Sequence, residues 1–466
     1  MTDHSAAEPL PLDRDASVSR PVAGAAPDGA ESALGPWPSA RTGWYTTGLL
    51  AAAYFLSYMD RAIIGLLVEP IKIDLHLSDT ELGLVTGFSF AVFYALAGLS
   101  LGRLADSGNR KRLVAAAILT WSAMTVLCGF TRSFGMLFLA RVGVGVGEAG
   151  LNPAALSIIS DNFPPERRHF AITTFNVGGS LGGGLAFVLG AGILAFAETL
   201  TSISLPIWGV LKPWQWTFVI VGAPGFALAA LVCVSFREPV RRGLGSMTAP
   251  SVPLREIVAY FRTNARCFTG LFVAPAFLYM INLGYLVWAP AMFVRVHDLE
   301  LKFVGAVFGG SVLVSAVAGN FLCAALVRRY ERKGYTDGPL RAMRLVVAIT
   351  APLVCLGALA PNPYLSMAML APGIGLLVAS VVLPNIAIQT IVPNRLRGQS
   401  VALFLLGVNV IGGGLGPLAI ALLTDNVFGD ENLIHYSATT LAIVVLPLAL
   451  AVFHWALPGY RETSSR

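Results

Sequence analysis

The feature that most constrains this chain is a series of apolar segments, each long enough to cross a lipid bilayer. A membrane-spanning helix needs about 20 consecutive, predominantly apolar residues. The sequence offers such a run at residues 44–70, 80–104, 111–131, 134–160, 168–197, 214–236, 266–294, 301–328, 341–360, 364–391, 397–424 and 433–457. Charged residues make up only 12% of the chain, against about 25% in soluble domains. We therefore predict an all-α polytopic membrane protein with twelve transmembrane helices.

The polar segments divide the chain. Residues 1–42 are rich in Ala, Pro, Ser and Asp and contain no apolar stretch before Trp44, so we expect a disordered tail. This tail lacks the basic and apolar regions of a signal peptide. A polar stretch broken by Pro and Gly, at 237–265, separates the sixth and seventh segments. We expect it to link two six-helix bundles, at 43–236 and 266–457, with a short tail at 458–466.

Positive charge marks one side of the predicted membrane protein. Loops after even-numbered segments carry twenty Lys and Arg residues, whereas loops after odd-numbered segments carry five. Because cytoplasmic loops are enriched in Lys and Arg, we expect both termini in the cytoplasm. The net charge of +6 then reflects topology, and no nucleic-acid partner is expected.

The two halves of the chain resemble each other. Asp74-Leu-His-Leu before the second segment recurs as Asp298-Leu-Glu-Leu before the eighth, an offset of 224 residues. Pro164 and Arg168 after the fourth segment recur as Pro393 and Arg397 after the tenth, an offset of 229. Agreement at two separate places indicates a duplication of six helices, as in many transporters.

Four charged residues fall at membrane depth. Asp60 and Arg61 lie in the first segment, and Arg141 and Glu148 lie in the fourth. A charge in hydrocarbon costs at least a few kcal/mol, so such residues usually face the interior of the bundle and serve function. Asp60 and Arg141 lie at similar depth, and Glu148 lies two turns, about 10 Å, nearer the cytoplasm on the face of Arg141.

Two interpretations of these charges remain open. An acid beside an arginine is held ionised and takes up a proton when the pair separates, so Asp60, Arg141 and Glu148 suit a proton relay or a clamp on a charged substrate. The structural alternative is a static salt bridge that fixes helix packing. Arg61 has two further alternatives, which are to extend toward the membrane surface or to pair with Glu148.

The second half has no charge at the positions equivalent to these four. A cavity between the halves would then be charged on one wall and largely apolar on the other, which suits an amphipathic ligand. The expected residues of the second wall are Tyr279, Asn282, Tyr285, Trp288, Leu370, Leu377, Asn385 and Gln389. The alternative for any one of them is a place in the protein core or against lipid.

Glycine clusters interrupt several of the apolar segments, among them Gly178-Gly179 and Gly182-Gly183-Gly184 in the fifth. A phosphate-binding loop is disfavoured, because no Lys-Ser or Lys-Thr pair follows and the glycines lie within apolar helices. Close packing of neighbouring helices explains them better.

One loop motif carries a family resemblance. Between the second and third segments, residues 102–112 read Gly-Arg-Leu-Ala-Asp-Ser-Gly-Asn-Arg-Lys-Arg. This string resembles the signature loop of the major facilitator superfamily, with Ser107 in place of an arginine and Asn109 in place of a glycine. The resemblance implies two pseudo-symmetric six-helix bundles that rock around a central site. It also implies a conformational gate that locks the outward-facing state, formed by Gly102, Asp106, Arg110 and Lys111.

Within that superfamily the chain is similar to the spinster-like transporters. The similarity rests on Tyr58-Met-Asp-Arg61, on residues 77–84, and on Arg141 with Gly145-Val-Gly-Glu-Ala149. It implies lipid-like substrates, such as sphingosine 1-phosphate and lysophospholipids, and coupling to protons. It implies a coupling role for Asp60 and Arg141 and a supporting role for Arg61 and Glu148.

These observations together predict a monomeric secondary active transporter that moves an amphipathic lipid or other amphipathic small molecule. No metal cluster or nucleotide site is evident in the sequence, so no cofactor is expected and a proton gradient is the expected energy source. The alternatives within transport are an organic-anion symporter and a multidrug antiporter, because related anion transporters share the Asp-Arg pair of the first segment.

Two other classes of membrane protein are disfavoured. A polytopic acyltransferase needs a histidine and an acid at defined spacing. Of the six histidines, His4, His76 and His297 have an aspartate within three residues, and none of the three has that spacing. We therefore expect no catalytic residues. A channel is disfavoured because no ring of repeated charge and no carbonyl filter motif is evident.

Overall fold

The computed structural model describes residues 36–206, 208–242 and 254–464, and within them twelve helices are long and apolar enough to cross a membrane. The prediction of twelve spans is therefore confirmed. The first six spans, the N-half, are α2 (Ala40–Leu75), α3 (Asp79–Gly83) with η1 (Leu84–Phe88) and α4 (Ser89–Ser107), α5 (Arg110–Cys128), α6 (Phe134–Glu148) with α7 (Leu151–Asn162), α8 (Pro165–Thr199) and α9 (Pro213–Ser235).

The last six spans form the C-half. They are α11 (Ala265–His297), α12 (Leu301–Phe303) with η3 (Val304–Phe308) and α13 (Gly309–Arg332), α14 (Gly338–Leu359), α15 (Pro363–Ser380) with α16 (Val382–Ile391), α17 (Asn394–Gly407) with η4 (Val408–Gly414), α18 (Leu415–Leu423) and η5 (Thr424–Phe428), and α19 (Ile434–Ser464). Outside the spans lie β1 (Ser204–Leu205) and β2 (Gly209–Val210), α10 (Leu254–Thr263) and η6 (Glu431–Leu433).

The predicted linker and the predicted tail at 458–466 differ from the structure. Residues 1–35 of the expected tail and 243–253 of the expected linker lie outside the described residues. The linker also contains a short helix, α10. The last helix continues through Ser464, so most of the expected tail at 458–466 is helical. Its last turns pack on the C-half through Tyr460, which is fully buried.

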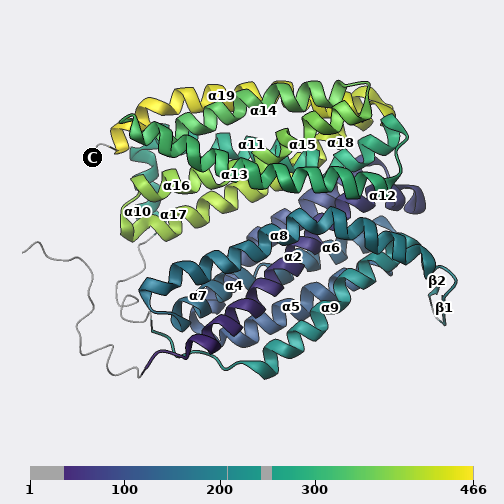
Figure 1. The fold of residues 1–466 in the computed structure, drawn as a ribbon, viewed down its shortest axis with the longest axis horizontal. Helices are drawn as coiled ribbons and strands as arrows, with labels where there is room; N and C mark the ends of the chain where they lie inside the picture. Colours follow the sequence, from purple (N-terminus) through teal and green to yellow (C-terminus); the bar gives the residue numbers. More distant parts are fainter. Residues whose placement is uncertain (1–35, 207, 243–253, 465–466) are drawn as a thin grey trace, which may run out of the picture.

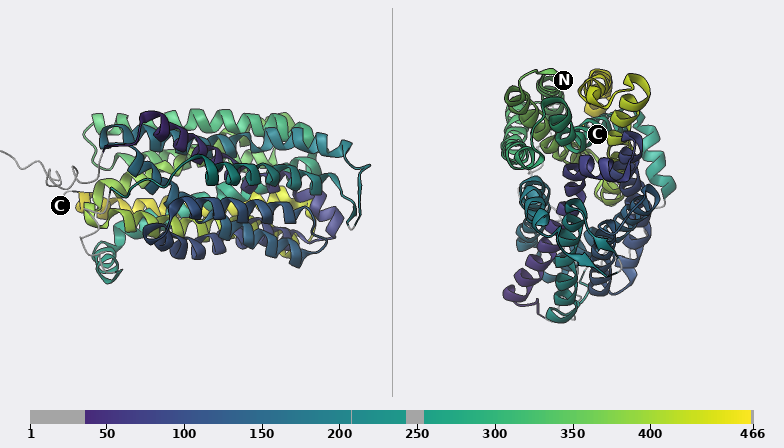
Figure 2. Two further views of the ribbon diagram at one scale, coloured as in Figure 1. Left: turned by 90° about the horizontal axis from the view of Figure 1, so that it is seen from below. Right: turned by 90° about the vertical axis from the view of Figure 1, so that its right-hand side faces the viewer.

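The two halves form separate groups of helices that run in nearly the same direction. Within the N-half α2 packs against α8 and α5 against α9, and within the C-half α11 packs against α19 and α13 against α15. Figure 1 shows the C-half above and the N-half below. Figure 2, in the view along the helices, shows the same two groups end on. We call the end with the loops after even-numbered spans the Arg-rich end.

Glycines bring α2 and α8 into backbone contact. A Cβ at Gly178 would overlap the carbonyl group of Ala51, and a Cβ at Gly182 would overlap that of Phe55. Small residues of this kind let membrane helices approach closely enough for their backbones to touch. The predicted packing role of this glycine cluster is confirmed at these two positions.

The halves contact each other at the end opposite the Arg-rich end, which we call the closed end. There η1 packs on η4 and α3 on α18, while η3 packs on α8. Glycines again allow the approach: a Cβ at Gly83 would lie 2.9 Å from the Leu418 Cα, and one at Gly305 would lie 2.9 Å from the Ala191 Cβ. The second span of each half thus packs on the fifth span of the other, as a duplicated fold requires. Toward the Arg-rich end the ribbons of the two halves diverge (Figure 1).

A buried aspartate ties the last helix to the C-half. Asp337 lies between α13 and α14, its side chain is 2% exposed, and its oxygens lie 2.7 Å from Arg341 Nε and 2.7 Å from Arg461 Nη2. Burial raises the pKa of the Asp337 carboxyl, but the hydrogen bonds and charges of the two arginines outweigh burial and hold that pKa below its usual value.

We expect Asp337→Asn to lower the thermal unfolding midpoint by a few degrees at neutral pH. An aspartate with a lowered pKa stabilises the folded state fully above its unfolded-state pKa of about 4, and this contribution is lost as the pH falls through the folded-state pKa. Melting curves of both proteins in detergent, from about pH 7 down to about pH 3, should converge toward acid pH. A midpoint difference that does not change with pH would contradict this account.

Candidate functional site

The sequence-predicted charges form a cluster inside the N-half. Asp60 is 1% exposed at the middle of α2. Its Oδ2 accepts a hydrogen bond of 3.1 Å from the Thr125 hydroxyl of α5, while its Oδ1 has no hydrogen-bond partner. A buried carboxyl group with a single hydroxyl partner is incompletely satisfied, which is unusual for a buried acid.

The expected ion pair between Asp60 and Arg141 is not formed in this structure. Arg141, in α6, is fully buried and reaches only the backbone carbonyl of Asp60, through Nη1 at 3.5 Å. Its Nε and Nη2 have no hydrogen-bond partner. The two side chains belong to one cluster, but the carboxylate turns toward Thr125 and the guanidinium lies near the Phe90 ring, 5.7 Å from its centroid.

Glu148 instead pairs with Arg61. Its Oε2 lies 2.6 Å from Arg61 Nη2 and also accepts a hydrogen bond of 2.8 Å from the Ser57 hydroxyl. Glu148 Oε1 and Arg61 Nε have no hydrogen-bond partner. Of the alternatives for Arg61, pairing with Glu148 is the one that the structure shows.

Aromatic rings surround the Arg61 guanidinium. The centroids of the Tyr58, Phe90 and Tyr94 rings lie 4.8, 4.4 and 5.1 Å from its central carbon. Such distances give cation–π attraction. Tyr279, on α11 of the C-half, lies within electrostatic range of Arg61. Arg61 is therefore the member of the cluster that approaches the other half.

Most of the expected apolar wall lies in the core of the C-half, which corrects that expectation. Asn282, Tyr285, Trp288, Leu370 and Leu377 are each at most 3% exposed. The Trp288 indole donates to the Pro417 carbonyl at 2.8 Å, and the Tyr285 hydroxyl donates to the Val354 carbonyl at 3.4 Å.

The physical reason is the position of α11. It contacts α15, α18, α19 and η4 within the C-half and α2 in the N-half, so nearly all of its faces are covered. Of the remaining expected residues, Tyr279 and Asn385 are partly buried and Gln389 is exposed. These three are the expected wall residues that remain accessible in this conformation.

In the part of the chain that the structure describes, the polar contacts of the expected gate go to the N-half and to the segment after α9. Arg110 is fully buried, donates to Glu238 at 2.6 Å and to Ser157 at 2.8 Å, and also pairs with Asp161. The backbone N–H of Lys111 donates to Glu238 at 2.7 Å. In the described residues the gate makes no hydrogen bond or ion pair to the C-half, as expected where the halves diverge.

Two other gate residues have different surroundings. Asp106 is exposed, and its backbone carbonyl accepts a hydrogen bond of 2.5 Å from Arg241. A Cβ at Gly102 would meet no atom within 4 Å, so nothing crowds that position.

Among the described residues no group of three or more His, Cys, Asp or Glu side chains is arranged to hold a metal ion.

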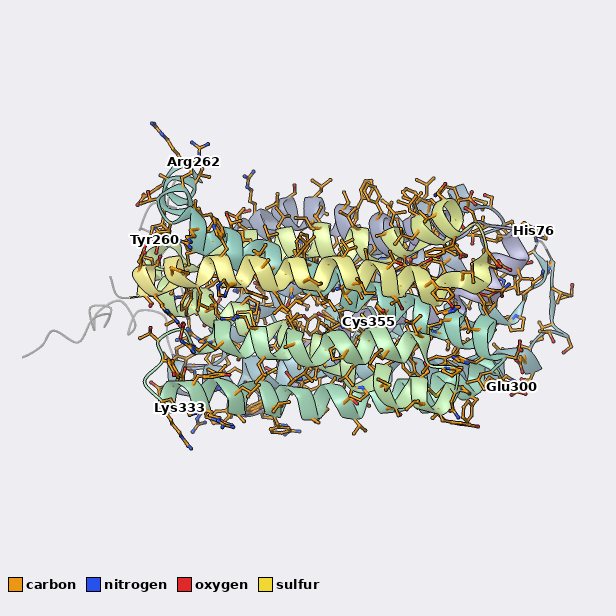
Figure 3. The ribbon with its side chains drawn as sticks, turned by 90° about the horizontal axis from the view of Figure 1, so that it is seen from above. His76, Tyr260, Arg262, Glu300, Lys333 and Cys355 are labelled. Atoms are coloured by element: carbon orange, nitrogen blue, oxygen red, sulfur yellow. The ribbon has the colours of Figure 1, made fainter. Side chains whose placement is uncertain are left out.

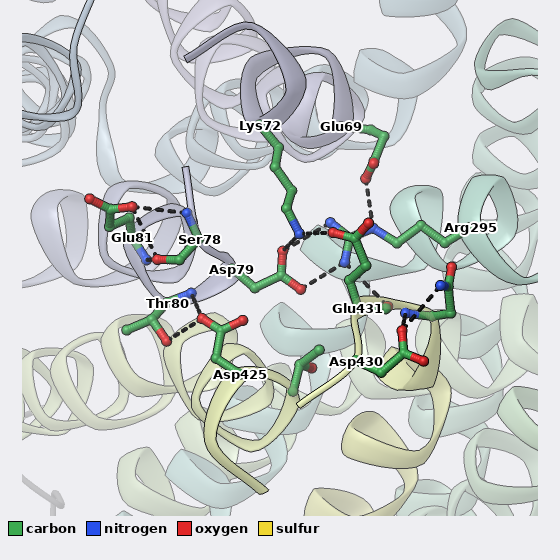
Figure 4. A network of polar contacts seen from close by, with 12 residues as sticks. Glu69, Lys72, Ser78, Asp79, Thr80, Glu81, Arg295, Asp425, Asp430 and Glu431 are labelled. Carbon is green, nitrogen blue, oxygen red and sulfur yellow. Dashed lines mark hydrogen bonds and ion pairs between the residues drawn. The ribbon is translucent and has the colours of Figure 1, made fainter. Parts of the chain in front are cut away.

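A network of charges at the closed end joins the halves, and sequence reasoning missed it (Figure 4). The fully buried Asp79 of α3 accepts from Lys72 at 2.7 Å and from two nitrogens of Arg295, which belongs to α11, at 2.7 and 2.9 Å. Arg295 also donates to Glu69 at 2.7 Å, and Lys72 pairs with Glu431 of the C-half. These contacts hold the two halves together at this end.

The sequence contains a partial signal for this network. Ser78 and Glu81 form a capping box that begins α3, and that spacing is readable. Thr80 donates to Asp425 through both its backbone N–H and its hydroxyl, at 2.7 and 2.6 Å. The partners of Asp79 and Thr80 in the C-half, however, lie 216 and 345 residues away. No local pattern connects residues at that separation.

Known proteins resemble this chain over most of its length. The family model described as Major Facilitator Superfamily matches residues 50–417. An MFS-type efflux pump of Mycolicibacterium smegmatis is 30% identical, and the match covers 91% of this chain and 94% of the efflux pump. The sphingosine-1-phosphate transporter SPNS2 of Danio rerio is 23% identical, over 88% of this chain and 82% of its own.

A solved structure gives the same result for the fold. A bacterial homologue of the human lysosomal transporter spinster, in an inward-facing and unoccupied conformation, is 26% identical, with a TM-score of 0.75. The match covers 92% of this chain and 98% of that one. This chain therefore belongs to the Major Facilitator Superfamily and is a multi-pass membrane transporter related to the spinster proteins.

Proposed function

We propose that the protein is a proton-coupled secondary active transporter that moves an amphipathic, lipid-like substrate, such as a lysophospholipid or a sphingolipid. The observation that carries the proposal is Asp60, a buried acid whose charge is not paired and whose Oδ1 has no hydrogen-bond partner. Ionisable residues at membrane depth in transporters usually serve ion or proton pathways.

The geometry suggests how a proton is exchanged. Arg141 has two unbonded nitrogens and lies beside the backbone of Asp60. A small shift of α6 against α2 would bring its guanidinium to the carboxylate. The acid would then gain a cationic partner in one state and lose it in the other, so it would release and take up a proton during each cycle. No bound cofactor is needed for this step.

The substrate class rests on the surroundings of Arg61. The Arg61–Glu148 pair offers both signs of charge among aromatic rings, and Tyr279 of the C-half lies within electrostatic range of Arg61. These groups suit a molecule with a polar head and an apolar body. The relative named as a sphingosine-1-phosphate transporter supports this choice.

A multidrug antiporter or an organic-anion symporter is the second candidate. The relative named as an efflux pump is 30% identical, and a probable L-galactonate transporter of Escherichia coli is 26% identical over 55% of each chain. Both candidates use the same charged cluster and differ in the substrate that it accepts.

We further propose that the Arg-rich end faces the cytoplasm of a bacterium, with the chain acting as a monomer in the inner membrane and both termini inside. The distribution of Lys and Arg supports this orientation. The structure would then be closed to the outside. The inward-facing state of the spinster homologue supports the same assignment.

Flux into liposomes tests the proposal. Purified protein should accelerate the transfer of lysophosphatidylcholine or sphingosine 1-phosphate across the membrane, and an imposed pH gradient should change the rate. Galactonate and a cationic dye serve as competitors and as alternative substrates. If galactonate or the dye moves and neither lipid does, the second candidate replaces the first. If the rate is the same with and without the pH gradient, proton coupling is wrong.

A further inference from the structure

One face of α13 changes character along its length. Residues spaced by three or four positions fall on one helix face. Such a series on α13 is Val314, Val317, Phe321, Ala325, Arg328 and Arg332. The first three are 69, 50 and 71% exposed and apolar, whereas the last two are exposed and basic. The stripe is therefore apolar in the membrane and cationic at the Arg-rich end.

The basic part of this stripe lines a hollow. A hollow of about 680 Å³ at the end of α13 is lined by Ala325, Arg328, Arg329, Arg332 and Lys333. In the part of the chain that the structure describes, none of these four cations has a side-chain hydrogen bond or an ion pair. Glu331, on the same turn, does not line the hollow. Figure 3 shows Lys333 at this end of the molecule, opposite the end with His76 and Glu300.

Other arginines at the same end are neutralised by the protein itself. Arg110 pairs with Asp161 and Glu238, and Arg341 and Arg461 share Asp337. The fold therefore supplies acids where it uses arginines to hold elements together. At the end of α13, within the described residues, no acid pairs with the four cations, although Glu331 lies on the same turn. Topology explains why basic residues lie on this side, but not why four of them gather around one hollow.

We propose that the Arg-rich end of α13 binds the phosphate head group of an anionic membrane phospholipid, whose acyl chain lies along the exposed apolar face of the same helix. From Phe321 to Arg332 the helix rises about 16 Å, which is about half of the 30 Å hydrocarbon thickness of a bilayer. The part of the stripe from Phe321 to Arg332 thus spans about one leaflet. Clusters of Lys and Arg at the cytoplasmic end of a membrane helix attract anionic lipid head groups.

This site does not depend on the transported substrate. Its residues all belong to the C-half and lie outside the charged cluster around Asp60. The inference therefore stands if the proposed substrate class is wrong, and it rests only on the insertion of α13 in a membrane.

Lipid binding in nanodiscs tests the proposal. The protein is placed in phosphatidylcholine nanodiscs, and binding of a fluorescent phosphatidylglycerol is measured for the wild type and for the double variant Arg328→Gln/Arg332→Gln. Each arginine near a lipid head group contributes about a fivefold effect, so the double variant should bind about 25-fold more weakly. Both side chains are exposed, so folding should be unaffected, and Arg332→Glu alone provides a second variant.

A matched control removes the same charge at the same end. Arg255 and Arg262, on α10, are exposed and do not line the hollow, and Figure 3 shows Arg262 pointing away from the helices. Arg255→Gln/Arg262→Gln should change binding less than twofold. An equal loss in both double variants would show diffuse attraction by the whole basic surface and would overturn the proposal.

Competition separates a lipid from other ligands. Unlabelled cardiolipin and phosphatidylglycerol should displace the fluorescent lipid, whereas added phosphatidylcholine should not. Millimolar inorganic phosphate should displace it poorly, because it has no acyl chain to contact Phe321. Displacement by phosphate as effective as that by phosphatidylglycerol would identify a site for a free anion instead.

Discussion

Asp60→Asn should abolish the response of transport to a pH gradient while leaving the protein folded. Asparagine has the same shape and can keep the hydrogen bond from Thr125, but it cannot take up or release a proton. One pH unit supplies about 1.4 kcal/mol per proton, which supports about tenfold accumulation. In liposomes with an imposed gradient, the variant should lose this accumulation and should equilibrate its substrate only down the substrate gradient.

Thr125→Val is the control for this result. It removes the hydroxyl that donates to Asp60 but leaves the carboxyl in place. We expect this variant to keep a response to the pH gradient with a shifted pH midpoint. Asp60 would be excluded as the proton carrier if Asp60→Asn accumulated substrate as the wild type does. Melting curves of both variants check that neither change unfolds the protein.

Asp79→Asn should open the closed end. Asp79 is fully buried and accepts hydrogen bonds from Lys72 of its own half and from Arg295 of the other half. Removal of one partner from a buried ion pair costs about 3–5 kcal/mol, because the remaining charge stays buried without compensation. A loss of about 3 kcal/mol from the closed state alone shifts its equilibrium with the open state by about a hundredfold.

Spin-label distances measure this shift. Ile73 of α2 and Val427 of η5 lie in different halves near the closed end and are 67 and 66% exposed. Labels at both positions, in a background that carries Cys233→Ser and Cys355→Ala, should report a longer distance in Asp79→Asn. The label pair alone, with Asp79 intact, provides the reference distribution.

Lys302→Gln is the matched control for Asp79→Asn. It removes the ion pair between Lys302 and Glu198, which also joins the halves at this end. Unlike Asp79, the Lys302 side chain is 43% exposed. Exposed pairs contribute about 0–1 kcal/mol, so the distance distribution should hardly move. Equal shifts in the two variants would show that burial of Asp79 is not what holds this end closed.

The number of spans and their grouping were predictable because they depend on composition and on local pattern. Twenty apolar residues in a row allow few structures besides a membrane helix, and repeated motifs at offsets of 224 and 229 residues reveal a duplication without any structure. The packing of Gly178 and Gly182 was equally readable, because glycine in an apolar helix has few other uses.

The pairing of the buried charges was not predictable in the same way. Depth along a helix placed Asp60 beside Arg141, and the structure does bring the two residues together. The direction of each side chain, however, depends on neighbours such as Thr125 and Phe90, which lie on helices that the depth argument does not consider. Depth along a helix therefore predicts which charged residues cluster, but not which hydrogen bonds or ion pairs they form.

The prediction of the apolar wall was wrong for most of its residues, for a related reason. Tyr285 and Trp288 fit an aromatic binding surface by composition, but they lie on a helix that is covered on nearly every side. Sequence pattern cannot distinguish a side chain that faces a substrate from one that faces a neighbouring helix when both surroundings are apolar. Arg295, the partner of Asp79 from the other half of the chain, was missed because it lies 216 residues away.

The close contact that glycines allow between α8 and α13 lies near one end of α13, and this position affects how far each end of the helix can move. Gly309 and Leu313 meet Phe187 and Gly184 near the closed end of α13. From Leu313 to Arg332 the helix extends about 28 Å. The contact with α8 therefore lies near one end of a long helix, where it would serve as a pivot. A tilt of about 10° there displaces Arg332 by about 5 Å for a helix of this rise. In the rocking motion that the proposed transport cycle requires, the Arg-rich end of α13 would therefore move much farther than the residues at this contact.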